Sequence, residues 1–96
     1  MSTDPKSEEF YNRLKEQLAQ NNSWPALYLY KFIVPADLEK IATIEAIFDG
    51  TYASISTRES SKGTFTSVSI KVKMESPEAV VQKYLEVSEV EGVISL

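Results

Sequence analysis

Apolar and polar residues alternate with a period of two along two neighbouring stretches in the middle of the chain. Residues 52–59 alternate, and after a turn at Ser61-Lys62-Gly63 the alternation resumes and continues to Met74. This period is typical of strands with one buried face, and a glycine-bearing turn between two such strands is typical of a hairpin. We therefore predict an antiparallel hairpin that has one apolar and one polar face.

Helical patterns lie on both sides of the hairpin. In residues 7–20, Phe10, Leu14 and Leu18 recur every four positions, which predicts an amphipathic helix. A second helix is predicted from Asp37, its N-cap, to a stop at Asp49-Gly50, with these residues on its apolar face: Leu38, Ile41, Ala42, Ile44, Ile47 and Phe48. Ser76 and Pro77 are typical of the start of a third helix, which ends before Gly92.

Two further strands complete the pattern. Residues 27–34 are dense in large apolar residues, so we predict a central strand with both faces partly covered. Residues 93–96 form a short last strand. An order of helix and then β-α-β-β-α-β predicts an α+β, ferredoxin-like fold, in which a four-stranded antiparallel sheet of order 4-1-3-2 carries two helices on one face, plus the added N-terminal helix.

The predicted organisation is a single domain with an N-terminal extension. Residues 1–6 are expected to be a disordered tail, residues 7–25 the N-terminal helix and linker, and residues 26–96 the ferredoxin-like domain. The apolar stripe of the added helix must pack against something. The open sheet face, a sheet edge and another subunit are the three alternatives.

The amino-acid composition excludes several classes of chemistry. The 96-residue chain has no cysteine and no histidine, which excludes thiol catalysis, disulfides, imidazole bases and most zinc or copper sites, and no cofactor is expected. The net charge of −4 argues against general nucleic-acid or anionic-membrane binding. The polar N-terminus has no apolar segment typical of a signal peptide, so a cytoplasmic location is expected.

Three segments resemble a known family. They are Ser60-Ser61-Lys62-Gly63 followed by Phe65-Thr66-Ser67-Val68-Ser69-Ile70, then Tyr30-Lys31-Phe32-Ile33, and Val93-Ile94-Ser95-Leu96. Across residues 28–96 the chain resembles the YbeD-like family of small bacterial proteins of unknown function. The resemblance implies a fold like that of ACT regulatory domains and suggests small-ligand sensing. The chain differs from the family in its long N-terminal helix and in Pro35, where a glycine commonly follows the first strand.

Other functions of ferredoxin-like folds do not fit these residues. A metal chaperone needs paired cysteines, and acylphosphatase-like catalysis needs an arginine after the first strand, where this chain has Val34-Pro35-Ala36-Asp37. Lys62-Gly63 matches the start of the third strand of an RNA-recognition motif. The stacking positions, however, are Thr64, Thr66 and Ser69 rather than aromatic residues, so RNA binding is not expected.

The polar face of the predicted sheet is the main candidate for a binding surface. Strand parity places a set of basic and hydroxyl side chains on it: Lys31, Arg58, Ser67, Ser69, Lys71 and Lys73, together with Ser54 and Ser56. One interpretation is an anion site or a docking surface for an acidic partner. The alternative is an ordinary solvated sheet face, or a face covered by the N-terminal helix and balanced by Glu8, Glu9 and Glu16.

Two other residue groups have an ordinary structural interpretation. The aromatic residues Trp24, Tyr28, Tyr30 and Tyr52 could line a ligand pocket, but we expect them to pack in the core and anchor the linker. The carboxylate pairs Glu75 with Glu78 and Glu89 with Glu91 lie at polar helix ends, where solvated surface is the expected environment.

The sequence therefore predicts a non-enzymatic binding or regulatory module. The preferred hypothesis is a protein-interaction adaptor that uses the open sheet face, a sheet edge or the N-terminal helix, with a protein partner or a second copy of the chain bound there. The alternative is an ACT-like sensor of a small metabolite bound at a subunit interface. No nucleophile with an adjacent base can be assembled from these residue types, so catalysis is not expected.

Overall fold

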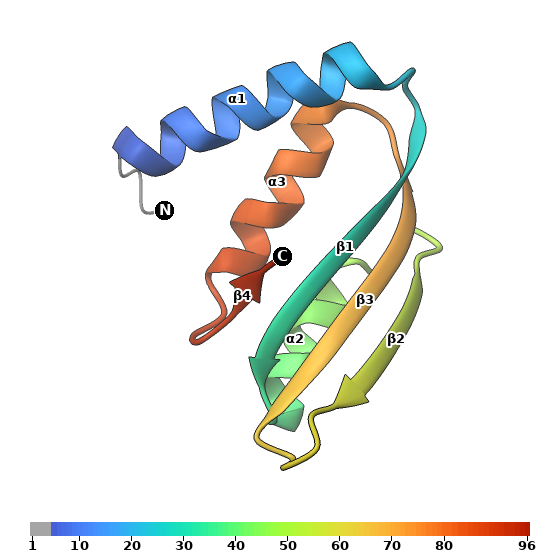
Figure 1. Cartoon of the computed structure of the whole chain (residues 1–96). Helices are drawn as coiled ribbons and strands as arrows, with labels where there is room; N and C mark the ends of the chain where they lie inside the picture. Colours follow the sequence, from blue (N-terminus) through green and yellow to red (C-terminus); the bar gives the residue numbers. More distant parts are fainter. Residues whose placement is uncertain (1–4) are drawn as a thin grey trace.

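The computed structural model describes residues 5–96, with side chains from residue 8 onward (Figure 1). Its elements in chain order are α1 (Pro5–Asn21), β1 (Ala26–Pro35), α2 (Leu38–Ile47), β2 (Ser54–Glu59), β3 (Phe65–Met74), α3 (Pro77–Ser88) and β4 (Ile94–Ser95). Most of the predicted tail, residues 1–4, lies outside the described residues. Pro5 and Lys6 already belong to α1, so this helix begins earlier than the sequence predicts.

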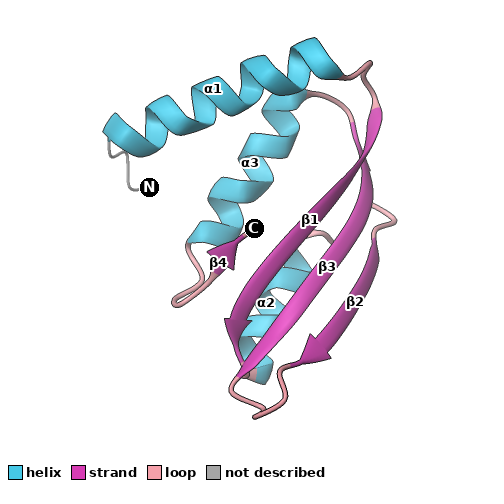
Figure 2. Cartoon of the chain, viewed as in Figure 1, coloured by secondary structure: helices cyan, strands magenta, loops and turns pink. Residues whose placement is uncertain are grey.

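The four strands form one antiparallel sheet in the order β2-β3-β1-β4, which is the predicted order read from the other edge. Figure 2 shows α2 behind the three long strands and α3 beside it, so the helices that follow β1 and β3 share one side of the sheet. The predicted α+β, ferredoxin-like fold with an added helix is confirmed. Within residues 5–96, β4 pairs only with β1, at Phe32 and Ile33.

The core lies between the sheet and these two helices. Alternate residues of β1 and β3 point into it and are fully or almost fully buried: Tyr30, Phe32 and Val34 from β1, and Val68, Ile70 and Val72 from β3. Ile44 of α2 and Val80 and Val87 of α3 meet them from the helical side. The period of two in the strands therefore fixes which residues are left on the opposite, open face.

Side-chain caps fix where the two packed helices begin. The Asp37 carboxylate accepts hydrogen bonds from the backbone N–H groups of Glu39, at 2.9 Å, and Lys40, at 3.4 Å. The Ser76 hydroxyl oxygen accepts one from the Ala79 N–H at 3.1 Å. Both predicted N-caps are confirmed, and each satisfies backbone donors that the first helical turn leaves without a partner.

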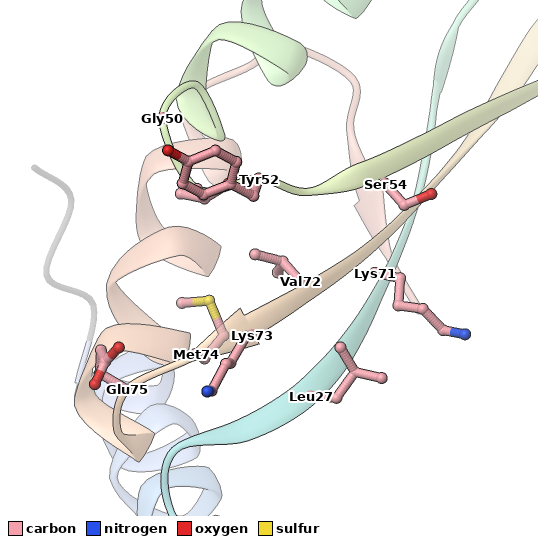
Figure 3. A pocket seen from close by; sticks show the side chains of 10 residues that line it. Leu27, Gly50, Tyr52, Ser54, Lys71, Val72, Lys73, Met74 and Glu75 are labelled. Carbon is pink, nitrogen blue, oxygen red and sulfur yellow. The ribbon is translucent and has the colours of Figure 1, made fainter.

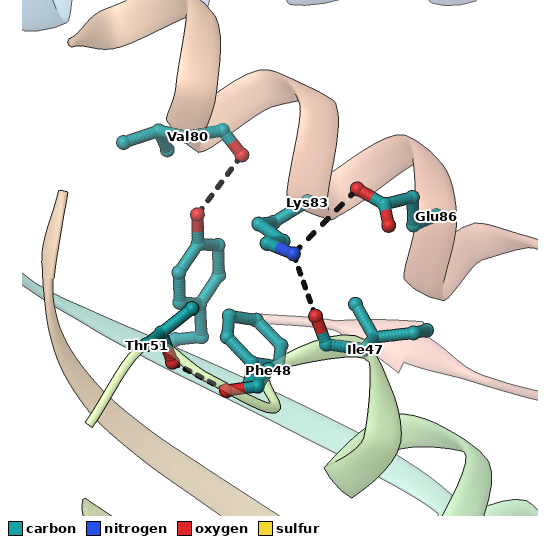
Figure 4. Close-up of polar contacts among 7 residues, drawn as sticks. Ile47, Phe48, Thr51, Val80, Lys83 and Glu86 are labelled. Carbon is teal, nitrogen blue, oxygen red and sulfur yellow. Dashed lines mark hydrogen bonds and ion pairs between the residues drawn. The ribbon is translucent and has the colours of Figure 1, made fainter. Parts of the chain in front are cut away.

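A lysine joins the two helices to each other (Figure 4). Lys83 Nζ of α3 donates a 2.6 Å hydrogen bond to the Ile47 carbonyl oxygen at the end of α2. The same ammonium lies 5.5 Å from the centre of the Phe48 ring and 3.9 Å from a Glu86 carboxylate oxygen. A cation at a helix C-terminus is favoured by the helix dipole, so this contact stabilises the relative position of α2 and α3.

Buried tyrosine hydroxyls are paired within the core. The Tyr30 hydroxyl donates to the Val80 carbonyl oxygen at 3.0 Å, and the hydroxyls of Tyr28 and Tyr84 are 2.8 Å apart. Burial raises the pKa of Tyr30 and Tyr84 far above the ordinary tyrosine value, because the phenolate would lose its hydration there. The expected core packing of Tyr28 and Tyr30 is therefore what the structure shows.

Helix α1 packs across α3 and leaves the open sheet face uncovered (Figure 1). Leu18 is buried in this contact, and the Trp24 indole N–H donates a 3.1 Å hydrogen bond to the Leu18 carbonyl oxygen. Phe10, at the other end of the stripe, is 59% exposed. Within the chain, α1 packs on neither the open sheet face nor a sheet edge, so two of the three predicted docking positions are wrong and the sheet face is not balanced by the carboxylates of α1. Packing of α1 on another subunit stays a prediction.

One prediction of burial in β1 and one in α2 are wrong. Leu27 and Leu29 of β1 are 65% and 61% exposed, because the helix that would have covered their side of the sheet lies on α3 instead. Leu38, assigned to the apolar face of α2, is 85% exposed. It occupies the first position of that helix, directly after the Asp37 cap and before the helix runs along the sheet.

Candidate functional site

The register of β1, β3 and β2 aligns the candidate surface residues in cross-strand rows on the open face. Lys31 lies opposite Ser69, which lies opposite Ser56 on the next strand. In the neighbouring row, Ser67 lies opposite Arg58. Residues directly opposite each other in adjacent strands point to the same side of a sheet, so these side chains form one continuous surface.

A shallow hollow of about 320 Å³ lies in the middle of this surface. The residues that line it are Lys31, Ser56, Thr57, Arg58, Ser67 and Ser69. Thr57 pairs with the buried Val68, so the side chains that the strands place on this face are those of the two cations and the three serines. Four of the six candidate residues thus come together here. The other two, Lys71 and Lys73, line a separate recess at the far end of the same face.

The open face is electropositive on an acidic protein. Every charged side chain that β1, β2 and β3 place on it is a cation: Lys31, Arg58, Lys71 and Lys73. Glu59 pairs with the buried Thr66 and therefore has the opposite parity. Among the described side chains, the ion pair within 4.0 Å joins Lys83 to Glu86, so none of these four cations is neutralised by a carboxylate in residues 8–96.

Carboxylates gather instead on the helical side. The lining of a hollow between α2 and the end of α3 includes four carboxylates, from Glu39, Glu86, Glu89 and Glu91, and one cation, Lys40. Glu75, Glu78, Glu89 and Glu91, which were considered as pairs, are all exposed. Within residues 8–96 no three acidic side chains are close enough to hold a metal ion. The two faces of the domain therefore differ in the sign of their charge, although the net charge is −4.

Comparison with known proteins places this face within a described family. A family model described as "Protein of unknown function (DUF493)" matches residues 19–96. The chain belongs to this family. The match begins near the end of α1 and includes the whole sheet, so the hollow and all six candidate residues lie inside it.

A curated relative supports the same assignment. A UPF0250 protein of Shewanella piezotolerans is 42% identical over 53 residues, which are 55% of this chain and 59% of the relative. The chain therefore matches less than two thirds of that relative's length. No solved structure matches the chain significantly. The resemblance to small bacterial proteins of unknown function is confirmed by the DUF493 match and this relative.

Sequence reasoning missed an apolar strip beside the cations. On the open side of the DUF493 sheet, Leu27 and Leu29 of β1 are joined by Ile94 and Leu96, which are 53% and 65% exposed. The Leu96 N–H donates to the Lys31 carbonyl oxygen, which places this end of the chain alongside the hollow. Strand parity could have identified Leu27 and Leu29, because they have the same parity as Lys31.

The prediction that Tyr52 packs in the core is wrong. Its side chain is fully exposed, and its backbone has a φ of 58°, a left-handed conformation that is rare for a bulky residue. It follows Gly50, which also has a positive φ, in the turn that joins α2 to β2. The predicted strand therefore begins at Ser54 rather than at Tyr52, and the tyrosine ring points into solvent.

The chemistry available on this face is binding of anions. Ammonium and guanidinium groups supply positive charge, and serine and threonine hydroxyls donate hydrogen bonds to oxygen anions. In the part of the chain that the structure describes, no helix is both long and apolar enough to cross a membrane. The open face is an exposed surface with positive charge and hydroxyl groups.

Proposed function

We propose that this DUF493 protein is a non-enzymatic adaptor that binds an acidic segment of a partner protein through its open sheet face. The observation that supports this most strongly is the hollow in which Lys31 and Arg58 lie among the side chains of three serines, with no carboxylate in the lining. Arg58 can donate two parallel N–H hydrogen bonds to a carboxylate, while Lys31 contributes a mobile point charge.

The rest of the open face adds further contacts for an acidic segment. Lys71 and Lys73 continue the positive charge along β3, and Leu27 and Leu29 form an apolar margin on the adjacent strand. An acidic segment that also carries apolar side chains would contact both parts. Exposed charges contribute mainly to the association rate and to partner choice, whereas the apolar margin contributes buried area.

A second copy of the chain fits this face less well. A symmetric, face-to-face dimer would bring each patch against its own equivalent, so the four cations of one subunit would face the same four cations of the other. Like charges placed opposite each other are destabilising. This argument favours a partner of opposite charge over self-association through the open face.

The proposal is tested by comparative capture. The immobilised full chain and the variant Lys31→Glu plus Arg58→Glu would be exposed to the same bacterial lysate and the bound proteins quantified. The matched control is Lys15→Glu plus Lys40→Glu, which changes the net charge equally but on the helical side. Each captured protein would then be purified and its binding measured at several salt concentrations.

The expected result is a purified partner with an acidic segment whose binding is lost in the open-face variant, kept in the control and weakened by salt. Binding that survives the open-face substitutions, or that the control variant loses equally, contradicts the proposal. Sedimentation at several concentrations distinguishes self-association. The metabolite-sensor alternative would instead be favoured by a melting temperature that rises with a small ligand.

A further inference from the structure

A second recess lies at the other end of the open face, beside the turn between α2 and β2 (Figure 3). It has a volume of about 650 Å³, within the usual range for small-molecule sites. Leu27, which is 65% exposed, supplies apolar surface to its lining beside the almost fully buried Val72 and Met74, and Lys71 and Lys73 supply positive charge. It shares no lining residue with the hollow around Lys31 and Arg58, so each site can be tested separately.

The recess exists because β2 leaves the sheet before β3 ends. The pairing of the two strands stops at Ser54 and Lys71, although β3 continues to Met74. Continued pairing would place Tyr52 opposite Lys73, but the left-handed backbone of Tyr52 turns the chain away. The β2-side edge of residues 72–74 therefore has no strand partner among the described residues, and backbone hydrogen-bonding groups of this edge face the recess.

The lining combines two chemical characters. Figure 3 shows the side chains of Val72 and Met74 between the turn and β3, with the two lysines extending from the same strand. Val72 and Met74 are already almost fully buried, so an apolar ligand body would remove mainly the exposed Leu27 side chain from water, and an anionic group would meet the ammonium groups. Glu75 at one end of the lining adds a negative charge, which favours a monoanion over a ligand with several charges.

Tyr52 contributes a strained backbone and an exposed ring at the rim. A left-handed φ of 58° at a bulky residue costs free energy, and its ring is fully exposed, so the described side chains provide no packing that repays this cost. A ligand in the recess would provide a surface on which the ring can pack. Tyrosine is well suited to this role because it offers a large contact area with few rotatable bonds.

We propose that the recess binds a small organic monocarboxylate with an apolar body. Lys73 and Lys71 hold the carboxylate, the exposed side chain of Leu27 contacts the apolar body, and the ring of Tyr52 packs over it. This site lies within one subunit and shares no lining residue with the hollow around Lys31 and Arg58, although Leu27, Lys71 and Lys73 also belong to the extended docking surface.

The test is an NMR titration of the ¹⁵N-labelled full chain with phenylacetate. Ligands of this size bind in the millimolar range, so concentrations up to about 20 mM are needed. The largest chemical-shift changes are expected at the amides of Tyr52, Val72, Lys73 and Met74. Phenylacetamide, the neutral isostere, should bind more weakly, and inorganic phosphate should not shift these amides.

Three variants distinguish binding in the recess from nonspecific attraction by the positive charge of the face. Lys73→Gln should weaken phenylacetate binding about two- to fivefold, as expected for one exposed ionic contact. Lys31→Gln, a lysine on the same face outside the recess, should leave the affinity unchanged. Tyr52→Asn should weaken binding without lowering the melting temperature, because asparagine tolerates the left-handed conformation.

Several results would overturn the proposal. They are an absence of shifts at the recess, equal binding of phenylacetamide, or equal losses in Lys73→Gln and Lys31→Gln. An unchanged affinity of Tyr52→Asn for phenylacetate would show that the ring of Tyr52 does not contact the ligand. Because the readout maps to residues of the recess alone, failure here leaves the docking proposal around Lys31 and Arg58 unaffected.

Discussion

Lys31 of β1 and Ser69 of β3 lie directly opposite each other at the centre of the open sheet face. Their neighbours in the strands, Tyr30 and Ile70, form the next pair and are fully buried on the other face. Because a slip of one residue would expose that core pair, the register that aligns Lys31 with Ser69 is fixed by hydrophobic burial. The position of the cation therefore follows from the fold and needs no local ion pair.

Lys31→Glu is expected to leave the free energy of unfolding within about 0.5 kcal/mol of the wild type, or to raise it. Lys31 is exposed and has no carboxylate partner among the described side chains, while Arg58 and Lys71 add positive charge to the same face. Urea unfolding at neutral pH measures the difference. A loss larger than about 1 kcal/mol would assign Lys31 a structural role that the contacts do not show.

Tyr30→Phe is expected to lower the free energy of unfolding by about 1 kcal/mol at pH 8, because the Val80 carbonyl oxygen loses its buried donor. The destabilisation should diminish in alkali. Burial raises the pKa of Tyr30 in the folded state, so above the ordinary value of 10.0 only the unfolded chain releases this proton.

The raised pKa of Tyr30 makes the free energy of unfolding of the wild type depend on pH. Stabilisation from the buried phenol is complete below the unfolded pKa and is lost as the pH rises above it, by about 1.4 kcal/mol per pH unit. Urea unfolding of both proteins at pH 8 and at about pH 11 should show the deficit of the variant shrinking to near zero. A deficit that stays constant across this range would contradict a raised pKa for Tyr30.

Leu18→Ala is expected to destabilise the protein by about 2–3 kcal/mol, because it creates a cavity where α1 packs on α3. Phe10→Ala is the matched control. It removes a larger side chain from the exposed end of the same helix and should change stability by less than about 0.5 kcal/mol. Thermal unfolding followed by circular dichroism compares the two. Equal effects would mean that α1 does not dock as observed.

Lys83→Met is expected to cost about 1 kcal/mol, because methionine keeps the apolar stem but removes the hydrogen bond to the Ile47 carbonyl oxygen. Glu86→Gln should change stability by less than about 0.5 kcal/mol, since its 3.9 Å contact with Lys83 is part of a partly exposed pair. Denaturant unfolding separates the two contacts. A larger effect of Glu86→Gln would show that the ion pair, rather than the helix-terminus contact, joins α2 to α3.

The fold could be predicted because its signals are local and agree with one another. The alternation in residues 65–74, the caps at Asp37 and Ser76 and the order of the elements all indicate the same sheet and helices. Strand parity also placed Lys31, Arg58, Ser67 and Ser69 on one face, because a period of two is fixed once the buried side is known.

What could not be predicted depends on long-range packing and on turn geometry. The apolar stripe of α1 shows that the helix must dock, but not that α3 is its partner. Leu27 and Leu29 were expected to be partly covered because residues 27–34 are dense in large apolar residues. The alternation around residues 52–59 extended a strand through Tyr52, because sequence alone did not indicate a left-handed tyrosine after Gly50. The recess beside that turn was missed for the same reason.

Titration of the ¹⁵N-labelled chain with a hexaglutamate peptide tests the docking proposal most directly. It reports where an acidic segment binds before any natural partner is known. We expect salt-sensitive shifts concentrated at Lys31, Ser56, Arg58, Ser67 and Ser69, and their loss in Lys31→Glu plus Arg58→Glu. Shifts concentrated at Lys15 and Lys40 on the helical side, or an absence of shifts at low salt, would contradict an acid-binding open face.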